Sequence, residues 1–263
     1  MHATSKNPGW KGLLCLLVLV AAAPACSRGS SPLLTADPTG SALWEQGQDA
    51  LVAAEWRDAV SSFDTLLRNY PSSPFLAESR LGMGRAYYEQ GRVESLIMAI
   101  DAFQSFLTYH PSHREVAYAQ YMVAMTYVAQ MRTADRDQTP TRQAIDAFQL
   151  LIDTHPESPL YDEAVRRRVA AIDLLAQHEL QVARWQSGRD EDWDAAIDRV
   201  EFALAEFPDT SIKCELHFTK AEAYRHGKMV EEALLTYEQV INDYPDCELV
   251  EEAQERVEDL RGS

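Results

Sequence analysis

The chain has 263 residues, of which 46% are hydrophobic, and 41 acidic against 24 basic side chains give it a formal net charge of −17. This apolar content can bury a core, so the composition excludes a disordered acidic tail and a collagen-like chain. The excess of acid argues against a nucleic-acid-binding protein, because affinity for phosphate depends on clustered Lys and Arg. Few glycines and long runs rich in Ala, Glu, Leu and Gln predict an all-α fold.

The N-terminal residues are typical of a signal peptide. Lys6 and Lys11 precede an unbroken apolar run over residues 13–23, which is shorter than the roughly 20 residues that span a bilayer. Small residues then lead to Cys26, an arrangement that resembles a bacterial lipobox. The resemblance implies that residues 1–25 are a lipoprotein signal peptide and that Cys26 carries a diacylglycerol and an N-acyl chain. Ordinary secretion with an unmodified Cys26 is the alternative.

The segment after the cysteine predicts where the mature protein is held. Ser27 stands where an Asp would favour retention in the inner membrane of enteric-type lipoproteins. The resemblance therefore implies a lipid anchor in the outer membrane, with the folded part on its periplasmic face. Residues 26–40 are rich in Ser, Gly, Pro and Thr and show little periodicity, so we expect a flexible tether.

Five later segments share one helical template. In each, an Ala is followed twelve residues later by a Pro, with a large apolar residue four positions after the Ala and further apolar residues at the first, seventh and eighth positions. These offsets lie on one face of an α-helix. The Ala is expected where helices approach closely, and the Pro ends the helix because it lacks an N–H. The segments are Ala59–Pro71, Ala99–Pro111, Ala144–Pro156, Ala196–Pro208 and Ala233–Pro245.

A second helix is expected between one template and the next. Ser73-Pro74 predicts its start, with the Ser hydroxyl as cap and the Pro at the first helical position, and Ser158-Pro159 repeats the signal. The template with this second helix resembles the tetratricopeptide repeat. The resemblance covers residues 41–261 and implies a superhelical stack of five helix-turn-helix repeats.

Several irregularities interrupt the regular repeats. In the second unit, Gly84 and Gly91 are expected to allow close helix contact and a tight turn. Residues 131–143 form an insertion in the third unit, and residues 160–185 contain no Gly or Pro, which predicts one long helix. An insertion in a regular solenoid is a common place for a partner site.

The irregular regions carry a more specific resemblance. The string ADRDQT at residues 134–139, the run at residues 155–185 and RVEFALAEFPDT at residues 199–210 resemble the BamD family, lipoproteins of the outer-membrane β-barrel assembly machinery. The resemblance implies a scaffold and not an enzyme. Its C-terminal half would hold the periplasmic domains of the barrel-forming subunit, its N-terminal half would recognise nascent outer-membrane β-barrel proteins, and accessory lipoproteins would be further partners.

Two residues can be matched individually to this family. Arg199 corresponds to an arginine that forms an ion pair with the barrel-forming subunit, although an Arg on a repeat helix is usually a solvated side chain. Tyr70 corresponds to an aromatic residue implicated in substrate contact, although an aromatic before the repeat Pro usually packs against the next helix. Both interpretations stay open for each residue.

The sequence contains no motif of a common catalytic site, such as G-x-S-x-G, H-E-x-x-H or a P-loop. The pairs His110 with His113, and Cys214 with His217, are too few ligands for zinc. We therefore expect no metal and no cofactor apart from the lipid on Cys26.

Cys15 would be removed with the signal peptide and Cys26 would be acylated, so two cysteines remain. Exported proteins can keep disulfides, so Cys214 and Cys247 are either a disulfide, which needs Cα atoms within about 7 Å, or two small buried residues.

Two other kinds of periplasmic repeat protein match the sequence less well. A Tol-linked cell-division coordinator typically carries an N-terminal coiled coil, and no sustained heptad precedes Leu43. A secretin pilotin is disfavoured by the long region between the third and fourth repeats. These adaptors are the alternatives to an assembly scaffold.

Overall fold

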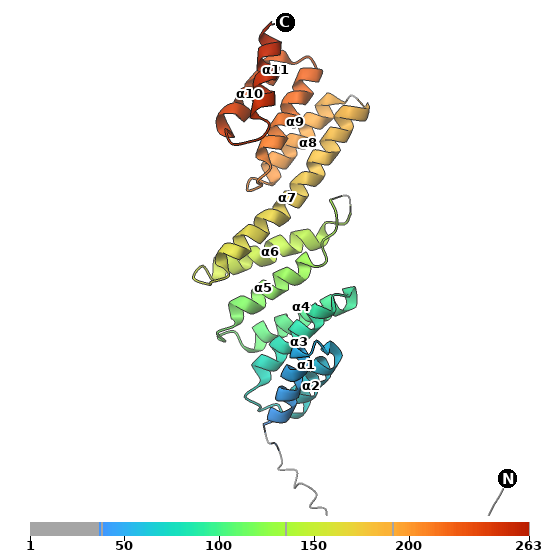
Figure 1. Ribbon diagram of the computed structural model, residues 1–263, viewed down its shortest axis with the longest axis vertical. Coiled ribbons are helices and arrows are strands. Elements are labelled where there is room, and N and C mark those ends of the chain that lie inside the picture. The colour runs from blue at the N-terminus through green and yellow to red at the C-terminus, as the bar shows by residue number, and fades with distance from the viewer. Residues whose placement is uncertain (1–36, 38, 135, 191, 263) are drawn as a thin grey trace, which may run out of the picture. The chain divides into compact units, whose positions relative to one another are not determined.

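A computed structural model describes residue 37 and residues 39–134, 136–190 and 192–262, with the side chains of 189 and 190 excepted (Figure 1). The predicted signal peptide, Cys26 and most of the predicted tether lie outside these residues. The chain divides after Ala36, and every described helix belongs to the unit that begins at Asp37.

The described residues form eleven α-helices and one short π-helical turn, and they contain no strand. The elements are α1 (Ser41–Val52), α2 (Trp56–Asn69), α3 (Leu76–Gln90), α4 (Val93–Tyr109), α5 (Val116–Val128), α6 (Thr139–Thr154), α7 (Tyr161–Trp185), η1 (Gln186–Asp190), α8 (Trp193–Glu206), α9 (Lys213–His226), α10 (Val230–Asp243) and α11 (Val250–Gly262).

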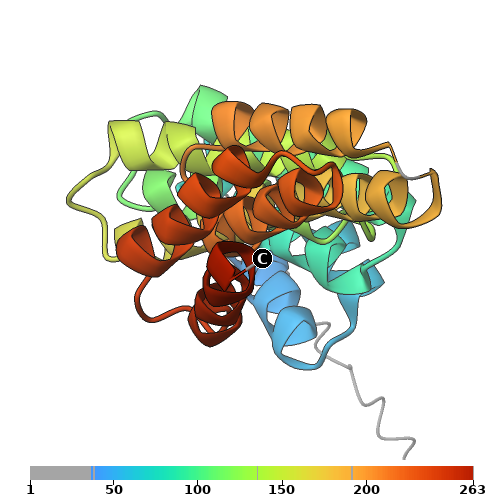
Figure 2. The same cartoon turned by 90° about the horizontal axis from the view of Figure 1, so that it is seen from above.

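Each helix packs against the next one in the sequence, from α1 to α11. Helices α1 to α10 form five helix-turn-helix pairs, and α11 follows as a terminal helix on α10. Figure 2 shows the successive pairs turned relative to one another. The prediction of an all-α, superhelical stack of five repeats is confirmed.

The repeated template accounts for the core of the stack. All five template Ala residues, and the large apolar residues four positions later, are completely buried. Burying each large side chain contributes about 1.5–3 kcal/mol relative to leaving it exposed. The core therefore continues along the stack as a series of clusters between neighbouring helices. The large template residues are Phe63, Phe103, Phe148, Val200 and Tyr237.

Gly84 and Gly91 of the second repeat do what their positions predict. A Cβ atom on Gly84 would lie 2.7 Å from the ring of Phe103, so a side chain there would collide with the buried template residue. Gly91 ends α3 with φ +66°, a left-handed conformation that costs glycine little.

The long helix predicted in the fourth repeat is α7, which has 25 residues. Near its start, Ala164 packs into the cluster of α6, while Leu180 and Ala183 pack into the cluster of α8. One helix thus belongs to two successive cores, as its course between α6 and α8 in Figure 1 shows.

The predicted start of the helix at Ser73-Pro74 is wrong, and so is the one at Ser158-Pro159. Helices α3 and α7 begin later, at Leu76 and Tyr161. The Ser73 N–H donates to the Tyr70 carbonyl, and the Ser73 hydroxyl accepts from the Phe75 N–H at 3.2 Å. The serine thus closes a turn with its hydroxyl before the helix begins, and Ser158 does the same with the Leu160 N–H.

Candidate partner-binding surfaces

Arg199 forms an ion pair with a buried carboxylate. Its side chain leaves α8, and its Nη1 atom donates to Oε2 of Glu179 on α7 at 3.0 Å. The Glu179 side chain is 12% exposed and the Arg199 side chain 40% exposed. Because an unpaired buried charge is costly, Arg199 stabilises the contact between α7 and α8.

The pair leaves part of the Arg199 guanidinium available. A guanidinium carries five N–H donors in one plane, and the Glu179 oxygen takes one of them. A carboxylate of a second protein could therefore bind the exposed edge of Arg199 while Glu179 fixes the other edge. Arg199 is then both a structural residue and a candidate interface residue.

An exposed aromatic side chain and a groove lie further along α8 than Arg199. Phe202, one turn further on, is 47% exposed and packs edge to face on Phe207. A groove of about 400 Å³ lies between α6, α7 and the end of α8, and its apolar lining includes Ile172, Leu175 and Phe207. This arrangement can take an apolar side chain next to a charged one, which is common at the centre of protein interfaces.

Tyr70 is half-buried at the C-terminal end of α2. Its ring packs over Gly40, where a Cβ atom would lie 3.0 Å from the ring. Its backbone N–H donates to the Leu66 carbonyl. The Tyr70 ring therefore packs on the start of α1. A substrate could contact only the exposed part of this ring.

The predicted insertion, residues 131–143, covers most of the connection between α5 and α6 and also the first five residues of α6, which begins at Thr139. It borders an open hollow of about 1040 Å³ together with the start of α4. Val93, in the first turn of α4, is 55% exposed beside this hollow. Asp137 fixes the end of the connection by accepting bonds from the backbone and hydroxyl of Thr139.

The structure brings Cys214 and Cys247 together in a disulfide, with their Cα atoms 6.6 Å apart. The bond joins the first turn of α9 to the connection before α11. The fifth repeat and the terminal helix are therefore linked covalently.

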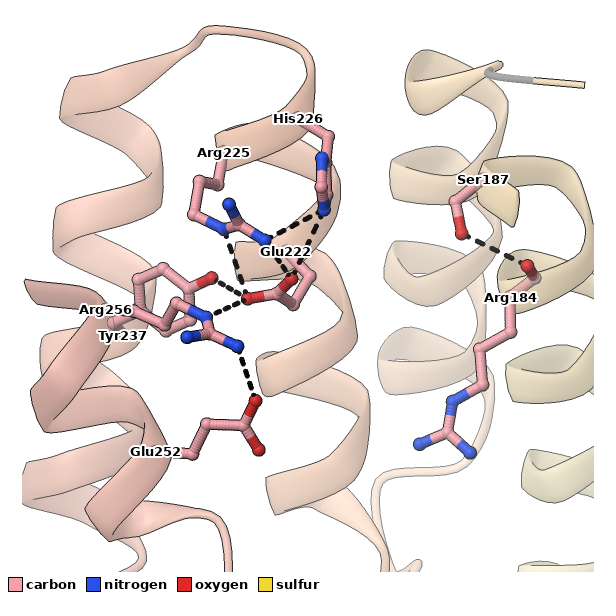
Figure 3. A network of polar contacts seen from close by, with 8 residues as sticks. All are labelled: Arg184, Ser187, Glu222, Arg225, His226, Tyr237, Glu252 and Arg256. Carbon is pink, nitrogen blue, oxygen red and sulfur yellow. Dashed lines mark hydrogen bonds and ion pairs between the residues drawn. The ribbon is translucent and has the colours of Figure 1, made fainter. Parts of the chain in front are cut away.

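A polar network at this end of the stack was not predicted from the sequence (Figure 3). The Glu222 carboxylate on α9 accepts a hydrogen bond from the Tyr237 hydroxyl of α10. It also pairs with Arg225 of α9 at 2.6 Å and with Arg256 of α11 at 3.2 Å. One carboxylate thus holds three helices together.

The network changes the pKa values of its members. Burial alone raises the pKa of Glu222, but the hydrogen bonds from Arg225 and Tyr237 and the charges of Arg225 and Arg256 bring it below its ordinary value. Burial and the Glu222 carboxylate raise the pKa of Tyr237. Tyr237 replaces the phenylalanine of three other templates, and a buried hydroxyl needs a partner, so this exchange was the signal for the network.

No group of three or more His, Cys, Asp or Glu side chains in the described part of the chain could hold a metal ion. His110 and His113 use ring nitrogens otherwise: His110 Nε2 lies 3.2 Å from Arg80, and His113 Nδ1 accepts from the Glu115 N–H. Within the same residues, no helix has the length and apolarity to cross a membrane.

The repeat fold and these surfaces define a tetratricopeptide-type binding scaffold. A tetratricopeptide-repeat model matches residues 216–246, and a family model described as outer membrane lipoprotein matches residues 36–229. The chain belongs to this outer membrane lipoprotein family.

Several curated relatives are similar over most of their length. An outer membrane protein assembly factor BamD of Vibrio cholerae is 30% identical over 81% of this chain and 89% of its own. The BamD of Haemophilus influenzae is 29% identical over 80% and 82% of the two chains, and that of Caulobacter vibrioides is 28% identical over 84% and 72%. Among solved structures, a TPR2AB domain of yeast Sti1 aligns with a TM-score of 0.45 and 13% identity over 84% of each chain.

Proposed function

We propose that this protein is the lipid-anchored scaffold of outer-membrane β-barrel assembly, a binding protein without catalytic activity. The observation that carries the proposal is the match of the lipoprotein family over residues 36–229, together with relatives that are named assembly factors and align over most of both chains. The name of these relatives, assembly factor, favours a role in β-barrel assembly over the cell-division and pilotin alternatives.

We assign each proposed partner to a surface of the stack. The α7–α8 surface with Arg199 binds the periplasmic domains of the barrel-forming subunit, because it offers a fixed guanidinium and, one turn further on, the exposed Phe202 ring. The N-terminal repeats, with Tyr70 at the end of α2, bind nascent barrel proteins. Accessory lipoproteins bind elsewhere on the stack.

Cys26 anchors the scaffold at the periplasmic face of the outer membrane through its acyl chains. Two such chains or more are needed for stable anchoring, because a single one gives marginal, reversible binding. The tether lets the repeats reach partners near the membrane.

Cys26→Ala tests the anchor and the function together. We expect the variant to leave the outer-membrane fraction and the amount of β-barrel proteins in that membrane to fall, because the scaffold is no longer concentrated there. Membrane fractionation in high salt and quantitative blotting of several barrel proteins measure both effects.

Cys15→Ala is the matched control, since it removes a cysteine from the predicted leader and should change neither result. Retention of Cys26→Ala in the outer membrane would contradict the anchor. Its release with unchanged barrel proteins would show that assembly does not need the anchor.

A further inference from the structure

Arg80 on α3 is a half-buried cation with neutral surroundings. Its Nε atom donates to the Ser105 hydroxyl at 3.2 Å, and its Nη1 atom bonds the Leu76 carbonyl and lies 3.2 Å from Nε2 of His110. The guanidinium carbon lies 4.7 Å from the ring centre of Tyr109. Its Nη2 atom makes no hydrogen bond or ion pair with any described residue.

The other half-buried arginines of the described chain differ from Arg80 in this respect. Each of them pairs with a carboxylate. The chain has a large excess of acidic side chains, so a carboxylate partner for Arg80 would have been easy to supply. They are Arg168 with Asp209, Arg199 with Glu179, and Arg225 and Arg256 with Glu222.

The same position in the third and fifth repeats is neutral. The position lies four residues before a buried small residue of the first helix of the repeat. The third repeat has Gln120 there, which contacts Thr154. The fifth repeat has His217 there, which stacks on Tyr244. These pairs join the first helix of a repeat to the end of its second helix without any charge. A cation at Arg80 is therefore not required by the repeat.

The groups around Arg80 do not neutralise it. Burial and the neighbouring guanidinium lower the pKa of His110, which keeps its ring neutral and able to accept from Arg80. Glu78 faces His113, at 3.9 Å from its Nε2 atom. Burial also lowers the pKa of Arg80 itself, since partial desolvation of a cation without a counter-ion is unfavourable.

We propose that Arg80 and Tyr109 form a receptor for a carboxylate group of a bound polypeptide. The carboxylate accepts from Nη2, and the Tyr109 ring, which is 66% exposed, packs on the apolar residue next to it. Such charge-assisted bonds are about twice as strong as neutral ones. The proposal rests on the proposed function, in which nascent barrel proteins are the polypeptides that the N-terminal repeats bind.

Two sources of carboxylate share this chemistry, the C-terminus of a polypeptide and an acidic side chain. The probes are three labelled peptides of alternating apolar and polar residues. The first is a C-terminal amide without acidic residues, the second has the same sequence with a free C-terminal carboxylate, and the third is an amide with one internal Glu. Fluorescence anisotropy with the purified mature protein measures each Kd.

We expect one or both carboxylate peptides to bind about tenfold tighter than the neutral peptide, and Arg80→Gln to abolish the difference. The peptide that gains affinity identifies the source. Arg114→Gln is the control for net charge, because the Arg114 side chain is 84% exposed, and it should keep the preference. Circular dichroism of both variants verifies the helical fold.

Equal binding of the three peptides to the wild type, or a preference that persists in Arg80→Gln, would overturn the carboxylate receptor and leave the proposed function intact. If the wild type binds none of the peptides, recognition of nascent barrel proteins fails together with this site. The two failures are therefore distinguishable.

Discussion

Arg199→Glu is expected to weaken binding of the barrel-forming subunit's periplasmic domains by about 100-fold, because removing one partner of a close charge pair typically costs about 2–5 kcal/mol. The substitution replaces the guanidinium that we propose as the partner contact and places a second carboxylate against the buried Glu179. Calorimetric titration of the purified mature protein with those domains measures the change. The exposed Phe202 ring remains intact in this variant.

The repulsion from Glu179 needs a control, since Arg199→Glu also destabilises the contact between α7 and α8. Glu179→Gln removes the buried charge. In that background, binding by the protein that also carries Arg199→Gln is compared with binding by the protein that keeps Arg199. Urea unfolding shows whether the two background variants are equally stable. If Arg199→Gln binds the domains as tightly as Arg199 does beside Gln at position 179, Arg199 does not contact the partner.

Glu222→Ala is expected to lower the free energy of unfolding by about 3 kcal/mol, because it leaves the Tyr237 hydroxyl without an acceptor and the half-buried Arg225 without a counter-ion. The variant loses the acceptor of the Tyr237 hydroxyl, the counter-ion of Arg225 and one of the two counter-ions of Arg256, which still pairs with Glu252 at 2.7 Å. Since these groups come from α9, α10 and α11, the loss should appear in the terminal repeat. Urea unfolding at pH 7 measures the total, and hydrogen exchange locates the loss.

The pH dependence gives this prediction a second readout. The pKa of Glu222 is lower in the folded protein than its ordinary value of 4.5, so its contribution to stability is complete above that value. It is lost as the pH falls through the folded pKa. The difference between wild type and Glu222→Ala should therefore shrink below about pH 4.5.

Glu251→Ala, an exposed position on α11, removes the same charge without touching the network. It should change stability by less than about 0.5 kcal/mol. Equal stability of Glu222→Ala and Glu251→Ala at pH 7 would show that the network does not hold the terminal helices together.

The fold was predictable because its determinants are local and repeated. The spacing from Ala59 to Pro71 recurs in five segments, so each segment supports the interpretation of the others. The long helix α7 followed from a run without Gly or Pro. The error at Ser73 has a local cause as well, because a serine before a proline can close a turn as readily as it caps a helix.

The surfaces were less predictable because they join residues that are distant in the sequence. Arg199 was matched to a family position, but its buried partner Glu179 lies 20 residues earlier on another helix. Three helices contribute to the Glu222 network. The disulfide stayed undecided because Cys214 and Cys247 are 33 residues apart, and only the packing of α9 against the following connection sets the distance between them.

Native co-purification tests whether the protein is part of the β-barrel assembly machinery. The wild-type protein is recovered from outer membranes solubilised in mild detergent, and the proteins that accompany it are identified and quantified. We expect the barrel-forming subunit of the assembly machinery to be recovered in near-equal amount with it. Recovery of cell-division or secretin components without that subunit would contradict the account.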